Sequence, residues 1–180
     1  MRLLFLVLCL FAATASGAAA QTPTPTIVQP ETIINGITIT NAGTYTAQTT
    51  SKPAQAGQRS PTGTVGTVTD WHFVSGSTDV DGKIGTQFGI EFRIDGPPAN
   101  GSVTLHLSLA FPPEGIRNPN TGTVLHDVKV AFPDLKIGSL CLLGYGFDNG
   151  WEIVPGEWKM QILYRDRVLT ERTFIVSKPE

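Results

Sequence analysis

The stretch PGEWKMQILYRDRVLTERTFIV, residues 155–176, decides the fold class. After the opening Pro-Gly pair, apolar and polar residues alternate, which is typical of a strand with one buried face. A short polar turn at 165–167 leads into a second strand. The residues predicted to face inward are Trp158, Met160, Ile162, Tyr164, Phe174 and Val176. Many immunoglobulin-like sandwiches close with such a hairpin.

The same period of two continues toward the N-terminus. It is strict in TQFGIEFRID (86–95) and SVTLHLSLAF (102–111) and weaker in four further segments. Those segments are 33–40, 44–49, 63–74 and 124–132. No mature stretch of ten residues has a helical period, and Gly and Pro turns separate the segments. We therefore predict a single all-β fold, an antiparallel immunoglobulin-like β-sandwich of about eight strands.

The first twenty residues, MRLLFLVLCLFAATASGAAA, have the three parts of a secretory signal peptide. Arg2 gives the positive start, an apolar run covers 3–15, and Ala18–Ala20 offers the small residues that signal peptidase requires. The run is shorter than the ~20 residues that span a bilayer. We expect cleavage after Ala20, no stable membrane insertion afterwards, and export to a periplasm or the extracellular space.

Residues 21–32, QTPTPTIVQPET, predict an extended Thr/Pro-rich linker, which leaves 33–180 as the sandwich domain. Inside that domain, TTSKPAQAGQRSPTG (49–63) contains almost nothing apolar and predicts a long exposed loop.

Charge and cysteine content exclude several classes of partner. Residues 1–20 contain Arg2 as their sole charged residue, so twelve Lys and Arg face fifteen Asp and Glu in the mature chain. No basic cluster of the kind that binds nucleic acid or anionic membranes occurs. Cys9 leaves with the signal peptide, so Cys141 can form no internal disulfide. Its apolar surroundings, SLCLLGYGF, indicate a buried structural thiol.

Five motifs resemble the bacterial domain-of-unknown-function family 3859. They are GTYTA (43–47), GTQFGIEFRI (85–94), FPPEGIRNPNTG (111–122), GYGFDNGWEIVPGEW (144–158) and ILYRDRVLTERTF (162–174). Together they span most of the mature chain after the linker. The resemblance implies an exported bacterial β domain and brings no activity, ligand or catalytic residue with it.

No catalytic or metal-binding constellation is evident. A Gly-x-Ser-x-Gly elbow is missing, and His72, His106 and His126 are scattered along the chain. The segment STDVDGK (77–83) begins like a calcium loop but has Ile90 where the twelfth-position acid belongs, which favours a structural turn. We expect no enzyme activity, no cofactor and no metal.

Two acids, Glu91 and Asp95, share the polar face of one predicted strand, with Arg93 between them. A solvated ladder of charges that discourages edge aggregation is the simplest interpretation. Glycosidase chemistry would require two acids facing each other across a cleft.

Two candidate binding surfaces stay open. The first is FPPEGIRNPNTG (111–122), which is either a corner between sheets or a rigid contact loop. Its candidate residues are Glu114, Ile116, Arg117, Asn118 and Asn120. This loop motivates the leading hypothesis, a non-catalytic binding or structural module that contacts an unknown protein or envelope component.

The second candidate surface motivates the alternative hypothesis. It consists of aromatic residues near strand ends, namely Trp71, Tyr145 and Trp151. Their rings would suit a small ligand or a glycan, whereas Trp158 has the pattern of a core residue.

Overall fold

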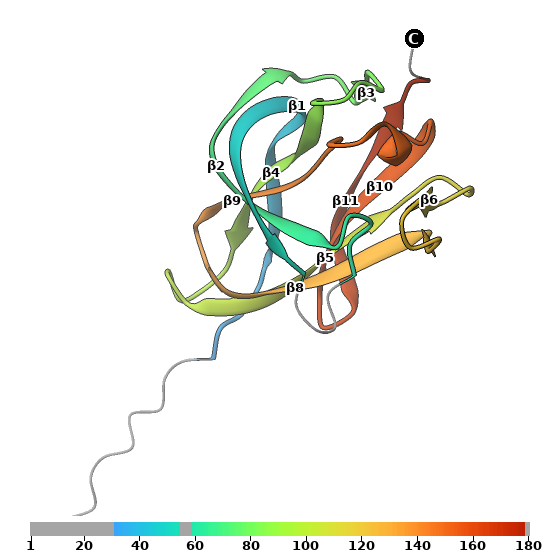
Figure 1. Ribbon diagram of the computed structural model, residues 1–180. Coiled ribbons are helices and arrows are strands. Elements are labelled where there is room, and N and C mark those ends of the chain that lie inside the picture. The colour runs from blue at the N-terminus through green and yellow to red at the C-terminus, as the bar shows by residue number, and fades with distance from the viewer. Residues whose placement is uncertain (1–30, 55–58, 179–180) are drawn as a thin grey trace, which may run out of the picture.

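The computed structural model describes residues 31–54 and 59–178 (Figure 1). These residues form eleven strands and one short 3-10 helix, Gly150–Glu152 (η1). The predicted signal peptide (1–20) and linker residues 21–30 lie outside the described residues. The described part of the chain contains no helix of the length and apolarity needed to cross a membrane.

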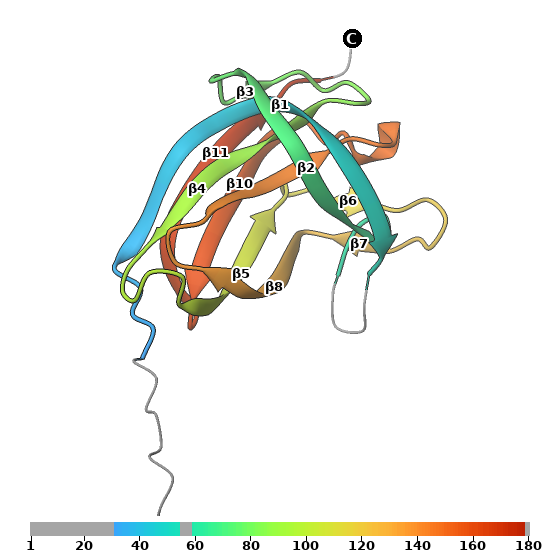
Figure 2. The same cartoon turned by 90° about the vertical axis from the view of Figure 1, so that its left-hand side faces the viewer.

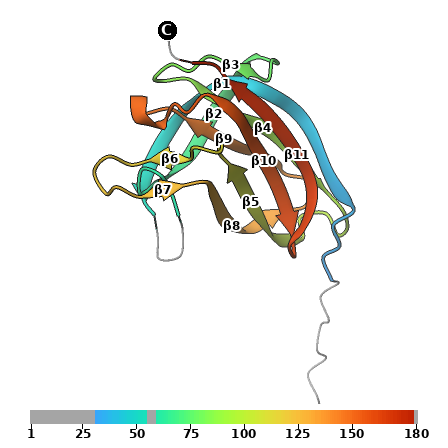
Figure 3. The same cartoon turned by 90° about the vertical axis from the view of Figure 1, so that its right-hand side faces the viewer.

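Two sheets pack face to face (Figures 1 and 3). The four-stranded sheet has the order β2-β1-β4-β9, with strands Gly36–Pro53 (β1), Thr64–Ser75 (β2), Gln87–Asp95 (β4) and Leu140–Gly146 (β9). The five-stranded sheet has the order β3-β11-β10-β5-β8, with strands Asp79–Val80 (β3), Ser102–Ala110 (β5), Asp127–Lys136 (β8), Gly156–Tyr164 (β10) and Arg167–Val176 (β11). All pairings are antiparallel except β3 with β11. A separate short ladder consists of Ile116–Arg117 (β6) and Val124–Leu125 (β7).

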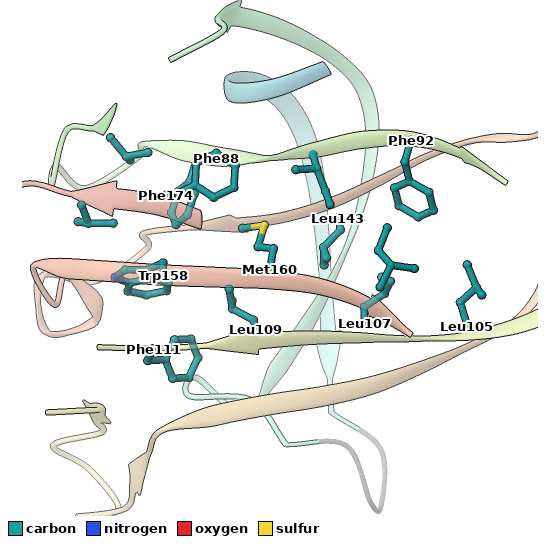
Figure 4. Close-up of a cluster of buried hydrophobic side chains, with 14 of the residues drawn as sticks. Phe88, Phe92, Leu105, Leu107, Leu109, Phe111, Leu143, Trp158, Met160 and Phe174 are labelled. Carbon is teal, nitrogen blue, oxygen red and sulfur yellow. The ribbon is translucent and has the colours of Figure 1, made fainter. Parts of the chain in front are cut away.

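The core lies between the two sheets and follows the predicted alternation (Figure 4). Phe88 of β4 packs edge-on against Trp158 of β10, with ring centroids 5.6 Å apart. Phe111 packs on the same indole at 4.9 Å. The indole N–H of Trp158 donates to the Val154 carbonyl at 2.8 Å, so this fully buried ring leaves no unsatisfied donor. The all-β sandwich prediction is confirmed.

The number of long strands agrees with the predicted number of about eight, but the long strands are not the eight predicted segments. Eight strands are seven residues or longer. The segments 33–40 and 44–49, predicted as two strands, form the single strand β1, whereas β9 was not predicted. The predicted loop at 49–63 is wrong in its first part, because 49–53 continue β1 and pair with β2.

Strand β1 changes partner midway along its length. Residues 36–45 pair with β4, and residues 44–53 pair with β2. Gly43 makes the change possible: its φ is +148°, and a Cβ there would lie 1.9 Å from the Ser75 carbonyl oxygen. Beyond this point, residues 46–53 of β1 and 64–72 of β2 form a two-stranded ribbon, here called the arm. Figure 2 shows it crossing in front of β4 and β9.

Candidate functional site

A buried carboxylate on β4 holds the arm against the sandwich. Glu91 is 8% exposed and accepts three hydrogen bonds. Its donors are the Thr40 hydroxyl (2.7 Å), the Asn41 side-chain amide (2.6 Å) and the indole N–H of Trp71 (2.8 Å). Because Trp71 belongs to the arm, this last bond links β2 to β4, which are not neighbours in the sheet.

The prediction that Glu91 belongs to a solvated ladder is therefore wrong, because the arm covers that part of the outer face. A register shift between Thr46 and Gln48 places Asp70 and Trp71 opposite one residue of β1, and Asp70 has φ +52°. Such a bulge re-aims the neighbouring side chain. Burial raises the pKa of Glu91, but the hydrogen bonds from Trp71, Thr40 and Asn41 outweigh it, so the pKa is below its usual value.

A second contact of the arm lies at its base, where Tyr45 covers the outer face of β9. Tyr45 is 5% exposed, and its ring packs beside Phe73 with centroids 5.8 Å apart. A Cβ on Gly144 would lie 2.2 Å from the Tyr45 hydroxyl, so only glycine fits beneath this ring. Burial raises the pKa of Tyr45 to about 12, and the hydroxyl is protonated at neutral pH.

The third contact joins the arm tip to the 111–122 loop. The side-chain amide of Asn118 donates to the Pro61 carbonyl at 2.8 Å. Its side-chain oxygen accepts the backbone N–H groups of Asn120 (2.8 Å) and Thr121 (3.3 Å), which fixes the loop as an Asx turn. A pocket of about 220 Å³ separates the two segments. The loop is therefore a corner that also seats the arm.

The arm, β9 and the inner face of β5 and β8 line a partly open cavity of about 620 Å³, here called the arm cavity. It exists because the four-stranded sheet ends at β9, while the five-stranded sheet continues through β5 to β8. The floor consists of Leu107, Leu109, Val128, Val130 and Phe132. Leu107 and Leu109 are buried, whereas the three β8 residues are partly buried.

The remaining walls are more polar than the floor. From the arm and its tip come hydroxyl-bearing residues, namely Thr49, Ser51, Ser60, Thr62, Thr64 and Thr67, together with Val65, Val68 and Trp71. From β9 and the turn after it come Leu142, Leu143, Tyr145, Asp148 and Glu152. Strand β9 thus has apolar residues toward both the core and the arm, which explains why its sequence lacks a period of two.

A second buried carboxylate lies in the cavity wall. Glu152, in η1, is 1% exposed and accepts the Tyr145 hydroxyl at 2.7 Å. It also accepts the backbone N–H (2.8 Å) and the side-chain amide (2.7 Å) of Asn149. Burial, reinforced by the charge of Glu152, raises the pKa of Tyr145. The Tyr145 hydroxyl donates its proton to this network, so it cannot also donate to a ligand.

The predicted binding residues separate into distinct groups. Trp71 and Tyr145 come together at the arm cavity, as the alternative hypothesis requires, but Trp151 is partly buried against the core and does not line it. In the loop, Ile116 is 1% exposed, so the expectation that it faces solvent is wrong. Its apolar side chain belongs to the core.

Three loop residues, Glu114, Arg117 and Asn120, are exposed. Sequence reasoning did not select Tyr45, which lies inside the GTYTA motif, or the valines of β8. Their role depends on how the arm is placed, and no local pattern encodes that placement.

Other candidate chemistries find little support among the described residues. No group of three or more His, Cys, Asp or Glu residues in this part of the chain could hold a metal ion. Gly82 of the calcium-like segment is buried where a Cβ would lie 2.3 Å from the Ser177 carbonyl oxygen, so the segment is a packed turn. Cys141 is partly buried, and burial raises the pKa of its thiol.

The two packed sheets, closed by the β10–β11 hairpin, define an immunoglobulin-like β-sandwich. A crystal structure of an immunoglobulin-like protein from Pseudomonas aeruginosa matches with a TM-score of 0.56 and 23% sequence identity. The match covers 83% of this chain and 99% of that chain.

A family model described as a domain of unknown function, DUF3859, matches residues 36–176, and the chain belongs to this family. This confirms the resemblance of the five sequence motifs. No curated protein matches the chain.

Proposed function

We propose that this domain is a non-catalytic binding module that holds a small apolar ligand in the arm cavity. The observation that carries the proposal is the uncovered inner face of β5 and β8, which forms the floor of a cavity of about 620 Å³. Ligand pockets have volumes of roughly 300–1,000 Å³ and combine mostly apolar walls with a few polar groups. The volume of the arm cavity lies in this range, and its apolar floor faces more polar walls from the arm.

A small molecule suits the site better than a partner protein. The outer strand of the five-stranded sheet, β8, contains Pro133 and a register shift opposite Thr104, and Lys129 and Lys136 are exposed along it. Proline, lysine and bulges are the features that prevent strand addition at a sheet edge. On the 111–122 loop, Asn118 already binds the arm tip. The leading hypothesis of a protein contact through this loop loses Ile116 and Asn118 as contact residues.

An aliphatic ligand suits the floor better than a glycan. Sugars stack on flat aromatic faces, but the floor is formed mainly by branched side chains, Leu107, Leu109, Val128 and Val130. Burying those surfaces against an aliphatic chain stabilises a complex by roughly 25 cal/mol per Å². Export of the mature domain, inferred from residues 1–20, is part of this proposal and would place the site outside the cytoplasm.

Titration with a neutral, environment-sensitive dye such as N-phenyl-1-naphthylamine tests the proposal. We expect saturable fluorescence enhancement that unlabelled aliphatic compounds reverse. Val130→Trp would fill the floor of the cavity from β8, and we expect it to weaken dye binding at least tenfold. Ala131→Trp is the matched control, because Ala131 is the next residue of the same strand, is exposed and does not line the cavity.

Two results would contradict the proposal. Absence of saturable dye binding would show that the cavity does not accept apolar molecules. Equal loss of binding in Val130→Trp and Ala131→Trp would show that the dye binds elsewhere or that both variants are misfolded, and circular dichroism separates these two cases. Binding restricted to a panel of polysaccharides would favour the glycan alternative.

A further inference from the structure

The free edge of β9 lies along the arm cavity. Consecutive residues of this strand, 142–146, all line the cavity, although successive side chains of a strand point to opposite faces. A cavity that contacts every residue of such a run lies along the edge of the strand. Because β9 is the last strand of its sheet, the backbone groups at this edge have no strand partner among the described residues.

The register with β4 shows which backbone groups of β9 face the cavity. The N–H of Phe147, the residue after β9, donates to the Thr86 carbonyl at 3.1 Å. Bonding alternates along an antiparallel pair, and the pairing of β4 with β9 contains no register shift. The odd-numbered residues of β9 therefore bond to β4. Leu142, Gly144 and Gly146 direct their N–H and C=O groups away from β4 and toward the cavity.

This edge lacks the features that prevent strand addition. The β9 sequence, LCLLGYG, contains no proline and no charged residue, and its ladder contains no bulge. Strand β8, by contrast, contains Pro133 and a register shift. A strand added beside β9 would extend the four-stranded sheet over β8, which that sheet leaves uncovered. An extended peptide would therefore pair with β9 and cover the floor at the same time.

The walls of the cavity specify the side chains of such a peptide. A Cβ on Gly144 would touch Tyr45 at the base of the arm, so the even-numbered residues of β9 face the arm. Opposite residues of an antiparallel pair share a face, so peptide residues bonded to Leu142 and Gly144 would also face the arm. Thr49 and Thr67 line that side, where small hydroxyl side chains fit. The alternate peptide residues would face the aliphatic floor.

Charge indicates which end of the peptide lies where. An antiparallel peptide would begin beside the C-terminal end of β9, where Asp148 lines the cavity. The Asp148 carboxylate makes no hydrogen bond or ion pair within the described part of the chain. The second acid, Glu152, already accepts from Tyr145 and Asn149. A free α-amino group would therefore complement the charge of Asp148.

We propose that the arm cavity binds a short extended peptide with uncharged side chains, antiparallel to the free edge of β9 and with its α-amino group beside Asp148. Aliphatic side chains would lie on the floor and alternate with small hydroxyl side chains toward the arm. This inference rests on the proposed function, because the aliphatic side chains fill the same floor, and it adds the ligand class. The complex is non-covalent.

Competition against the same dye tests the strand pairing, with the peptide amide Val-Thr-Val-Thr-Val as the probe. The backbone N–H groups of its two threonines would face β9, whereas those of its third and fifth residues would point away. We expect N-methylation of both threonines to weaken competition about tenfold or more, the scale of two neutral hydrogen bonds. N-methylation of the third and fifth residues is the matched control and should preserve competition.

A second comparison tests the position of the α-amino group. Acetylating the peptide should weaken its competition about 2- to 5-fold, the scale of an exposed ion pair. Asp148→Asn should weaken the free-amine peptide by the same factor and leave the acetylated peptide unchanged. Asp127→Asn is the matched control, because Asp127 is exposed and does not line the cavity.

The outcomes separate this inference from the proposed function. Saturable dye binding that no peptide reverses would overturn the inference and leave the proposed function standing. Equal effects of the two N-methylation patterns would overturn the pairing with β9. Equal competition by the free and acetylated peptides would overturn the contact with Asp148. If the dye itself fails to bind, the proposed function fails first.

Discussion

Replacing Glu91 with Gln measures how much the buried carboxylate contributes to holding the arm. The change keeps the size of the side chain but puts an amide nitrogen in place of one oxygen. The amide oxygen can still accept from Thr40 and Asn41, which both donate to Oε1, whereas the new NH₂ group would face the indole N–H of Trp71. The indole N–H of Trp71, in the arm, then loses its acceptor.

The expected cost follows from these three bonds. A hydrogen bond to a charged group contributes about 1.5–3 kcal/mol, and a buried donor left without a partner costs a similar amount. Weakening of the Thr40 and Asn41 bonds is offset by the smaller cost of burying a neutral amide in place of a charge. We expect Glu91→Gln to lower the free energy of unfolding by about 2 kcal/mol at neutral pH.

The same substitution has a defined pH dependence. The pKa of Glu91 is lower in the folded state than its ordinary value of 4.5, so the carboxylate stabilises the fold above that value. This stabilisation is lost as the pH falls through the folded-state pKa, because the protonated acid no longer accepts three hydrogen bonds. The difference between wild type and Glu91→Gln should therefore be largest near neutral pH and shrink steadily in acid.

Urea unfolding, followed by tryptophan fluorescence across this pH range, measures both effects. Hydrogen exchange of residues 64–72 then shows whether the arm loosens before the sandwich does. Glu114→Gln is the control, because Glu114 is exposed and its side chain makes no hydrogen bond within the described residues. A stability loss equal in acid and at neutral pH, or no loss at all, would refute the role assigned to Glu91.

Three further changes test other contacts. Gly144→Ala should displace Tyr45 and destabilise the protein by about 1–3 kcal/mol, measured by thermal unfolding; an unchanged melting temperature would contradict the close packing. Asn118→Ala removes the bond to Pro61 and two turn bonds, and should accelerate hydrogen exchange at the arm tip (59–64) more than in β10. Native Cys141 should react with a disulfide reagent at least tenfold more slowly than the unfolded chain, since burial raises its pKa; equal rates would contradict its burial.

The core of the fold could be predicted because its strands alternate strictly. In β4, the alternating residues Phe88, Ile90 and Phe92 are all fully buried in the core, as a period of two predicts. The rule fails for β9, whose Leu142 lies beneath the arm while Leu143 faces the core. It also fails for 49–53 of β1, where most residues are exposed and no hydrophobic pattern distinguishes a strand from a loop.

The candidate site could be predicted only in fragments. Trp71 and Tyr145 were selected because aromatic rings near strand ends would suit a small ligand or a glycan, and both line the cavity. Tyr45 and Glu91 were missed as site residues because their environment is created by a strand that changes partner at Gly43 and folds back over its own sheet. Contacts of that kind join residues far apart in the chain, and a single sequence contains no local signal for them.

A cavity as large as the arm cavity cannot be both closed and empty. A closed, empty cavity of 620 Å³ would cost on the order of 15 kcal/mol at about 24 cal/mol per Å³. That cost equals the whole stability of a typical domain, about 5–15 kcal/mol. The fold avoids it because the floor is partly open to water through Val128, Val130 and Phe132. An aliphatic ligand would exclude water from this surface. Ligand occupancy of the cavity and the free energy of unfolding should therefore rise together, as they do whenever a molecule binds the folded state alone.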